Sequence, residues 1–360
     1  WLLIARIVVG LGIGGDYPSS AVVASEHSCP QKRGFMVLLV FAMQAVGLIF
    51  GSLLASILLA INIDQSVVWR LLLGFGMIPA GSVFYLRRKI QESPHYARVK
   101  DLPVEASRVV SDLAGVEDDV VRLRYKKQSL LQPKWIMYLV ATCGAWFLMD
   151  VALYGNGISN VKILASLSPH ASLLNHTLMS AAIFTLFAVP GYILAAKYID
   201  KIGRRNLQLL GFLAMAVCFA LIASGLAGVK VQFVSAHSYT TVMSNFALFF
   251  IIYGVSYFFI NFGPNTTTFL IPSEIYPTAI RARAHGISAA VGKVGAFVGV
   301  FFLPYLLKNY GIQKLMFMMS LVSLTGLGLT LLLPEMGRLC LSATEDVKQT
   351  DPNTITGLET

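Results

Sequence analysis

Long apolar stretches, separated by short polar segments, make up most of this chain. A helix needs about 20 apolar residues to cross the hydrocarbon core of a bilayer, and these stretches reach that length. The pattern therefore predicts an all-α membrane protein with nine spans, at residues 1–24, 34–61, 67–86, 136–158, 176–197, 206–228, 243–270, 284–307 and 313–333. Three glycine pairs at the spacing of close helix packing lie inside these spans: Gly10 and Gly14, Gly47 and Gly51, and Gly295 and Gly299.

One long polar segment, residues 88–134, follows the third span. It carries charges of both signs, which is typical of a cytosolic linker between two helical bundles. We therefore expect residues 1–87 to form the second half of an N-terminal six-helix bundle, residues 135–333 a C-terminal six-helix bundle, and residues 334–360 a cytosolic tail. Three spans before the linker and six after it also predict a twelve-helix protein, of which the first three helices precede Trp1.

Composition and charge agree with this interpretation. The chain is 56% hydrophobic and 13% charged, with a mean hydropathy of +0.69, which excludes an ordinary soluble domain. With the linker in the cytosol, 21 Lys and Arg residues lie on that side, eleven of them in residues 87–134, and five lie on the other side. The net charge of +10 therefore indicates membrane orientation, and nucleic acid is not expected as a partner.

Ionisable side chains within the spans are the strongest functional signal, because they are costly in a bilayer unless they have a partner. Asp16 lies in GGDYPSSA, near the middle of the first span. Asp150 lies in the fourth span, and Trp146 and Tyr154 share its helix face at a spacing of four residues. Lys293, in AAVGKVGA, must find an anion, which is Asp150, Asp16 or a ligand.

An internal repeat relates the two halves of the chain. Residues 25–34 and residues 273–281 both begin with Ser-Glu and place an Arg seven positions after the Glu. In this register Tyr17 corresponds to Asn265, as expected for parallel repeats with a binding site between them. For Gln44 and for Asn265, a role in helix packing fits the sequence as well as a role in binding does. The turn DKIGRR, residues 200–205, is expected to connect helix ends as a gating element.

Several motifs resemble those of the phosphate:proton symporters of the major facilitator superfamily. They are GGDYPSSA, FAMQAVG, WFLMDVALYG, NFGPNTTTF, PSEIYPTAIRARAHGISAAVGKVGA and DKIGRR. The resemblance extends over nearly the whole chain, up to about residue 334, and begins at what would be the fourth helix of that family. It implies a major facilitator fold of which nine of twelve helices are present.

The resemblance also implies proton-coupled uptake of inorganic phosphate by alternating access, across the plasma membrane. The implied phosphate site is lined by Tyr17, Gln44, Trp146, Asp150, Tyr154, Asn265 and Lys293. Asp16 and Asp150 are the implied proton-coupling residues. The alternatives are a carrier of a sugar or an organic anion on the same scaffold, and a phosphate-sensing receptor without flux. No cofactor, metal site or enzymatic activity is expected, since the sequence shows no nucleophile–base pair and its four cysteines lack metal spacing.

Overall fold

The computed structural model describes residues 1–26, 28, 32–87, 124–125, 129–158, 160–168, 170–235, 238–335 and 347–348. The first part of the chain contains helices α1 (Leu2–Glu26), α2 (Arg33–Ala60), α3 (Gln65–Phe75) and α4 (Met77–Arg87). The second part contains α7 (Pro133–Ile158), α8 (Asn160–Leu167), α9 (Leu173–Ile183), the π-helix η2 (Phe184–Ala188), α10 (Val189–Ile202), α11 (Arg204–Ala223), α12 (Phe246–Phe262), α13 (Pro264–Glu274) and α14 (Thr278–Thr330). Most of the expected linker and tail lies outside the described residues.

Eight helical segments among the described residues are long and apolar enough to cross a membrane. The last of them, α14, has 53 residues and covers the span predicted at 284–307 and most of the span predicted at 313–333. These two helices meet at Gly311, whose φ of 73° and ψ of 172° interrupt the helical geometry. Glycine adopts this backbone conformation without steric cost, so the boundary falls where the sequence places it. The nine predicted spans and the eight segments therefore describe the same all-α arrangement.

Two further spans are interrupted rather than continuous. The predicted span at 67–86 consists of α3 and α4, which are separated at Gly76. The predicted span at 243–270 consists of α12 and α13, which are separated at Gly263, with Pro264 as the first residue of α13. Proline lacks the backbone donor that a continuous helix needs, so the helix is broken at Gly263 and Pro264.

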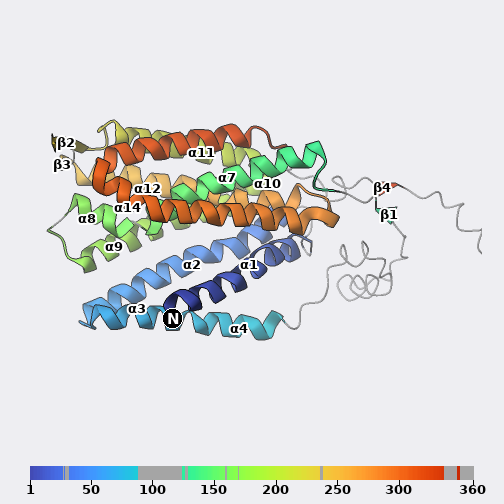
Figure 1. Ribbon diagram of the computed structural model, residues 1–360, viewed down its shortest axis with the longest axis horizontal. Coiled ribbons are helices and arrows are strands. Elements are labelled where there is room, and N and C mark those ends of the chain that lie inside the picture. The colour runs from blue at the N-terminus through green and yellow to red at the C-terminus, as the bar shows by residue number, and fades with distance from the viewer. Residues whose placement is uncertain are drawn as a thin grey trace, which may run out of the picture.

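The helices lie roughly along one long axis, with α1 to α4 on one side and α7 to α14 on the other (Figure 1). A β-hairpin, β2 (Val229–Ser235) and β3 (Ser238–Met243), lies at one end, which we call the hairpin end. The opposite end, where α1, α10 and α13 finish, is called the linker end. Another short antiparallel pair joins β1 (Arg124–Tyr125) to β4 (Val347–Lys348). Neither pair was predicted, because hydropathy alone does not distinguish a short hairpin from a loop.

Helix α7 packs closely against α14, and glycines make this possible. A Cβ atom at Gly299 would lie 3.1 Å from the backbone nitrogen of Gly155, and one at Gly292 would lie 2.6 Å from the Trp146 ring. The predicted close packing at Gly295 and Gly299 is therefore confirmed. For the other two glycine pairs, in α1 and α2, the prediction is wrong among the described residues: an added Cβ meets nothing within 4 Å.

Candidate functional site

An ion pair between α7 and α14 forms the centre of the candidate site. The Lys293 ammonium lies 3.3 Å from the Asp150 carboxylate and donates to the Tyr154 hydroxyl at 3.1 Å. Of the anions that the sequence left open for Lys293, the structure pairs it with Asp150. The Asp150 side chain is 1% exposed and that of Lys293 is 40% exposed, so a ligand can reach the site from the side of the ammonium.

The predicted face of α7 does point toward this pair. Tyr154 presents its ring to Lys293, with 4.5 Å between the ammonium and the ring centroid. Trp146 is buried against Gly292 of α14. Tyr17, from α1, completes this side, because its ring centroid lies 5.1 Å from the ammonium and 5.9 Å from the Trp146 ring. Aromatic faces attract cations, so these rings help to hold Lys293 in place.

A chain of hydrogen bonds extends from Tyr154 to the remaining predicted residues. Gln44 of α2 donates its amide to the Tyr154 hydroxyl at 3.5 Å. The Gln44 carbonyl accepts from the Tyr192 hydroxyl at 3.3 Å, and Asn265 of α13 donates to that same hydroxyl at 2.7 Å. The structure therefore brings all seven predicted substrate residues into one connected cluster, made from both parts of the chain.

Asp16 was predicted to serve the proton path rather than the substrate. In the structure it is partly buried and accepts a hydrogen bond from Ser20 of its own helix at 3.3 Å. The next residue, Tyr17, is the one that reaches Lys293. Neighbouring positions on a helix point about 100° apart, so the two side chains leave α1 in different directions. The proton-path role of Asp16 remains a prediction.

Sequence reasoning missed several residues around this cluster. Tyr192 connects Gln44 to Asn265 and is almost fully buried. Phe41 and Phe269 stack with 4.7 Å between ring centroids, and His285 lies edge-on to the Phe269 ring at 5.3 Å. An aromatic residue in an apolar span has no distinctive pattern. The signals that could have been read were the phenol of Tyr192 and the imidazole of His285, as polar groups within predicted spans.

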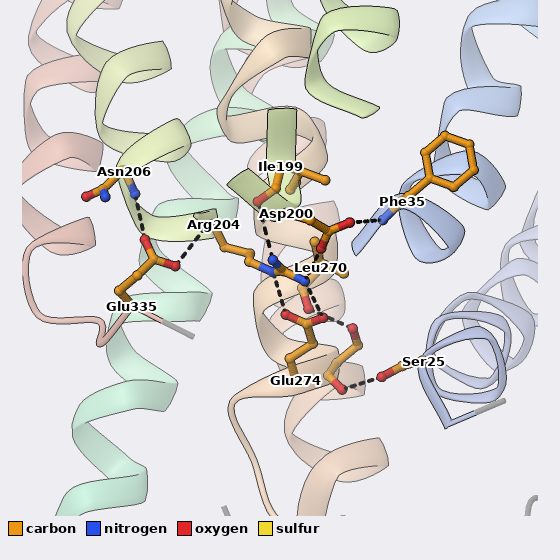
Figure 2. Close-up of polar contacts among 10 residues, drawn as sticks. Ser25, Phe35, Ile199, Asp200, Arg204, Asn206, Leu270, Glu274 and Glu335 are labelled. Carbon is orange, nitrogen blue, oxygen red and sulfur yellow. Dashed lines mark hydrogen bonds and ion pairs between the residues drawn. The ribbon is translucent and has the colours of Figure 1, made fainter. Parts of the chain in front are cut away.

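A second polar cluster closes the linker end (Figure 2). The guanidinium of Arg204 is paired with Glu274 at 2.8 Å and with Asp200 at 2.8 Å, and the Arg204 and Glu274 side chains are buried. Glu335 accepts from the backbone amides of Arg204 and Asn206, at 2.8 and 3.1 Å. These contacts join the ends of α10, α11 and α13, which confirms that the turn at 200–205 connects helix ends.

The same cluster joins the two parts of the chain. Asp200 accepts from the backbone amide of Phe35 at 3.1 Å, in the first turn of α2 (Figure 2). The Ser25 hydroxyl donates to the carbonyl of Ser273 at 3.2 Å, so the two copies of the Ser-Glu repeat meet in space. Together these contacts hold the linker end closed, and any opening there must break them.

Gly34 offers a test of this closure, because α2 approaches the charge cluster there. A Cβ atom at Gly34 would lie 2.5 Å from the Asp200 carboxylate and 2.7 Å from the Arg204 guanidinium. Since both groups are fixed by ion pairs, we expect Gly34→Ala to destabilise the protein by about 1–3 kcal/mol, as overpacking does. Thermal unfolding in detergent measures this loss.

Gly47→Ala is the matched control, because a Cβ at Gly47 of the same helix meets nothing within 4 Å. Alanine is the better helix former, so this variant should unfold at the same temperature as the wild type or slightly higher. Equal unfolding temperatures for Gly34→Ala and Gly47→Ala would mean that the charge cluster tolerates a Cβ atom at position 34, which contradicts the prediction.

Comparison with known proteins agrees with this architecture. Residues 1–345 match the sugar (and other) transporter family. The chain belongs to that family. It is 32% identical to "Probable inorganic phosphate transporter 1-6" of Arabidopsis thaliana, over 92% of this chain and 69% of that protein. It is also 32% identical to "Inorganic phosphate transporter 1-11" of Oryza sativa subsp. japonica, over 97% of this chain and 68% of that protein.

A solved structure has the same fold as this chain. The proton:xylose symporter XylE of the major facilitator superfamily, from E. coli, superposes with a TM-score of 0.74 at 17% identity. The match covers 94% of this chain and 72% of the symporter. The major facilitator fold that the resemblance implies is therefore confirmed, and so is the family resemblance carried by the motifs.

Proposed function

We propose that this transporter takes up inorganic phosphate together with protons across the plasma membrane. The observation that carries the proposal is the Lys293–Asp150 pair, with Tyr154 and Gln44 beside it, within apolar spans. The relatives at 32% identity that bear the name of inorganic phosphate transporters support it.

The chemistry of the cluster suits a partly protonated anion. Phosphate near neutral pH is a mixture of the mono- and dianion, and it needs one positive charge and several donors. Lys293 supplies the charge, while Tyr154, Gln44 and Trp146 carry O–H and N–H donors. Asp150 can accept a hydrogen bond from a phosphate O–H group. A sugar would need the donors and acceptors but not the ammonium, which is why phosphate is favoured over a sugar.

Alternating access gives the two polar clusters different roles. Residues of both parts of the chain form the candidate site, as expected when two repeats enclose a substrate. The contacts of the linker end join the two parts of the chain in the conformation described here, so release toward that end requires the Phe35–Asp200 and Ser25–Ser273 hydrogen bonds to break. Binding and release can then occur on opposite sides of the membrane.

The proposed orientation places the linker end in the cytosol, on the evidence of the Lys and Arg distribution. Leu226, near the hairpin, is 69% exposed. In a variant without its four cysteines, a cysteine substituted for Leu226 should react with an impermeant maleimide on intact cells. A cysteine substituted for the exposed Lys201, at the linker end, should react only after permeabilisation. The reverse labelling pattern would invert the orientation.

Uptake of labelled phosphate by the natural full-length protein in proteoliposomes tests the function. An imposed inward proton gradient should raise phosphate above its external concentration, and a proton ionophore should abolish this accumulation. Unlabelled xylose or glucose in excess should leave uptake unchanged. Competition by the sugar would support the sugar carrier, and phosphate binding without flux would support the sensor.

A further inference from the structure

Tyr192 is a residue that neither the motifs nor the proposed mechanism uses, although it lies between two of the implied phosphate ligands. It is 3% exposed and lies in the first turn of α10, after the π-helix at Phe184–Ala188 and directly after Gly191. A Cβ at Gly191 would lie 2.5 Å from the carbonyl oxygen of Phe258, so α10 passes α12 at close range there. This close passage fixes the position from which the phenol reaches the site.

The hydrogen bonds of Tyr192 have a defined direction. A phenol has a single hydrogen, and Tyr192 donates it to the carbonyl of Gln44 at 3.3 Å. With its carbonyl held in this way, Gln44 turns its amide NH₂ toward Tyr154 at 3.5 Å. Tyr154 accepts from both Gln44 and Lys293, so its own hydrogen is left to donate to a ligand.

Asn265 bonds to Tyr192 through its amide nitrogen, whereas Gln44 bonds to Tyr192 through its carbonyl oxygen. Its amide nitrogen donates to the Tyr192 hydroxyl at 2.7 Å and to the Asn261 carbonyl at 2.8 Å. These two bonds account for both amide hydrogens. The polar group that Asn265 has left to offer a ligand is its carbonyl oxygen, which is an acceptor. An acceptor binds an oxygen that carries a hydrogen and repels one that is ionised.

We propose that Tyr192 is a specificity-determining positioning residue, which orients the Gln44 and Asn265 amides so that the site selects oxyanions carrying a proton. Gln44 and Tyr154 then present donors to ionised oxygens, while Asn265 presents an acceptor to a P–OH group. Phosphate near neutral pH has such a group, and sulfate does not. The proposal rests on the proposed phosphate function and adds to it the basis for rejecting sulfate.

The physical reason is the cost of an unpaired polar group. Bound sulfate would place an ionised oxygen against the carbonyl oxygen of Asn265, with no hydrogen between them, and such mismatches are strongly discriminated in buried sites. Without the Tyr192 hydroxyl, the Gln44 amide is free to rotate by 180° and one Asn265 hydrogen loses its acceptor. The site would then offer more donors to sulfate and a less ordered donor set to phosphate.

Tyr192→Phe in the full-length protein tests this, since it removes only the hydroxyl. We expect the phosphate KM to rise about tenfold. We also expect sulfate to compete poorly with phosphate in the wild type and at least tenfold better in Tyr192→Phe. Arsenate, which also carries a proton, should weaken in parallel with phosphate. Tyr257→Phe is the matched control: Tyr257 is 1% exposed, and its hydroxyl is bonded to that of Tyr253 at 3.3 Å, away from both amides.

Asn261→Ala provides an independent variant that does not depend on Tyr192. It frees one hydrogen of Asn265, and sulfate should again compete better. The inference is overturned if sulfate competes no better in Tyr192→Phe than in the wild type or Tyr257→Phe, even where the phosphate KM rises. A wild-type protein that takes up no phosphate would refute the proposed function instead, so the two failures are distinguishable.

Discussion

Replacing Lys293 by glutamine is expected to weaken phosphate binding about 100-fold, which corresponds to roughly 2.7 kcal/mol. Glutamine still donates a hydrogen bond, but it carries no charge. Hydrogen bonds to charged groups contribute about 1.5–3 kcal/mol, so the loss of the ammonium accounts for an effect of this size. The substitution also leaves Asp150, which is 1% exposed, without its cation. An unpaired buried carboxylate would further disfavour an approaching anion.

Phosphate binding to purified full-length protein, measured by calorimetry, provides the test. Lys308→Gln is the matched control, because Lys308 lies on the same helix and is exposed. Thermal unfolding of both variants separates lost affinity from lost folding. Near-normal affinity in a folded Lys293→Gln protein would reduce Lys293 to a structural partner of Asp150.

The fold was largely predictable because a bilayer imposes a simple rule on sequence. Apolar length determines the spans, and Gly311 and Pro264 mark the places where helices change direction. The hairpin at Val229–Met243 was missed, because apolar length assigned this more polar segment to a loop between two spans, although VKVQF alternates apolar and polar residues as a strand does. The close packing expected at Gly47 failed, because glycine spacing shows where a neighbour can approach and not whether one does.

The centre of the site was predictable for a related reason. An ammonium deep in a span requires an anion, so Lys293 predicted a partner among Asp150, Asp16 and a ligand, and helical periodicity placed Tyr154 on the same face as Asp150. Tyr192 was not predictable, because its importance lies in the direction of its hydrogen bonds to residues of two other helices. The Arg204 cluster was predicted in part. Its turn at residues 200–205 was recognised in the sequence, but the hydrogen bond from Phe35 of α2 to Asp200 could be found only in the structure.

In the proposed function, Asp150 is the predicted link between the proton and the phosphate, through a single carboxylate. Ionised, it holds Lys293 at 3.3 Å and repels an anion; protonated, it releases Lys293 and can hydrogen-bond to phosphate. Protons should therefore favour phosphate binding, and phosphate should favour proton binding by the same factor, because linkage between two sites is reciprocal. Lowering the pH through the titration of this group should strengthen binding, in addition to the effect of phosphate's own protonation.

Asp150→Asn imitates the protonated state at every pH. The full-length variant is therefore expected to keep phosphate binding within a fewfold of the wild type, since Lys293 retains its bond to Tyr154 at 3.1 Å. Its affinity should vary less with pH, and uptake driven by a proton gradient should no longer accumulate phosphate. Binding at acidic and mildly alkaline pH, paired with uphill uptake in the same proteoliposomes, measures both effects.

Asp200→Asn at the linker end changes a carboxylate outside the site, so it should leave the pH dependence of binding intact. Uphill accumulation by Asp150→Asn would remove Asp150 from the coupling step and make Asp16 the better candidate, because it is the other acidic residue deep in a span.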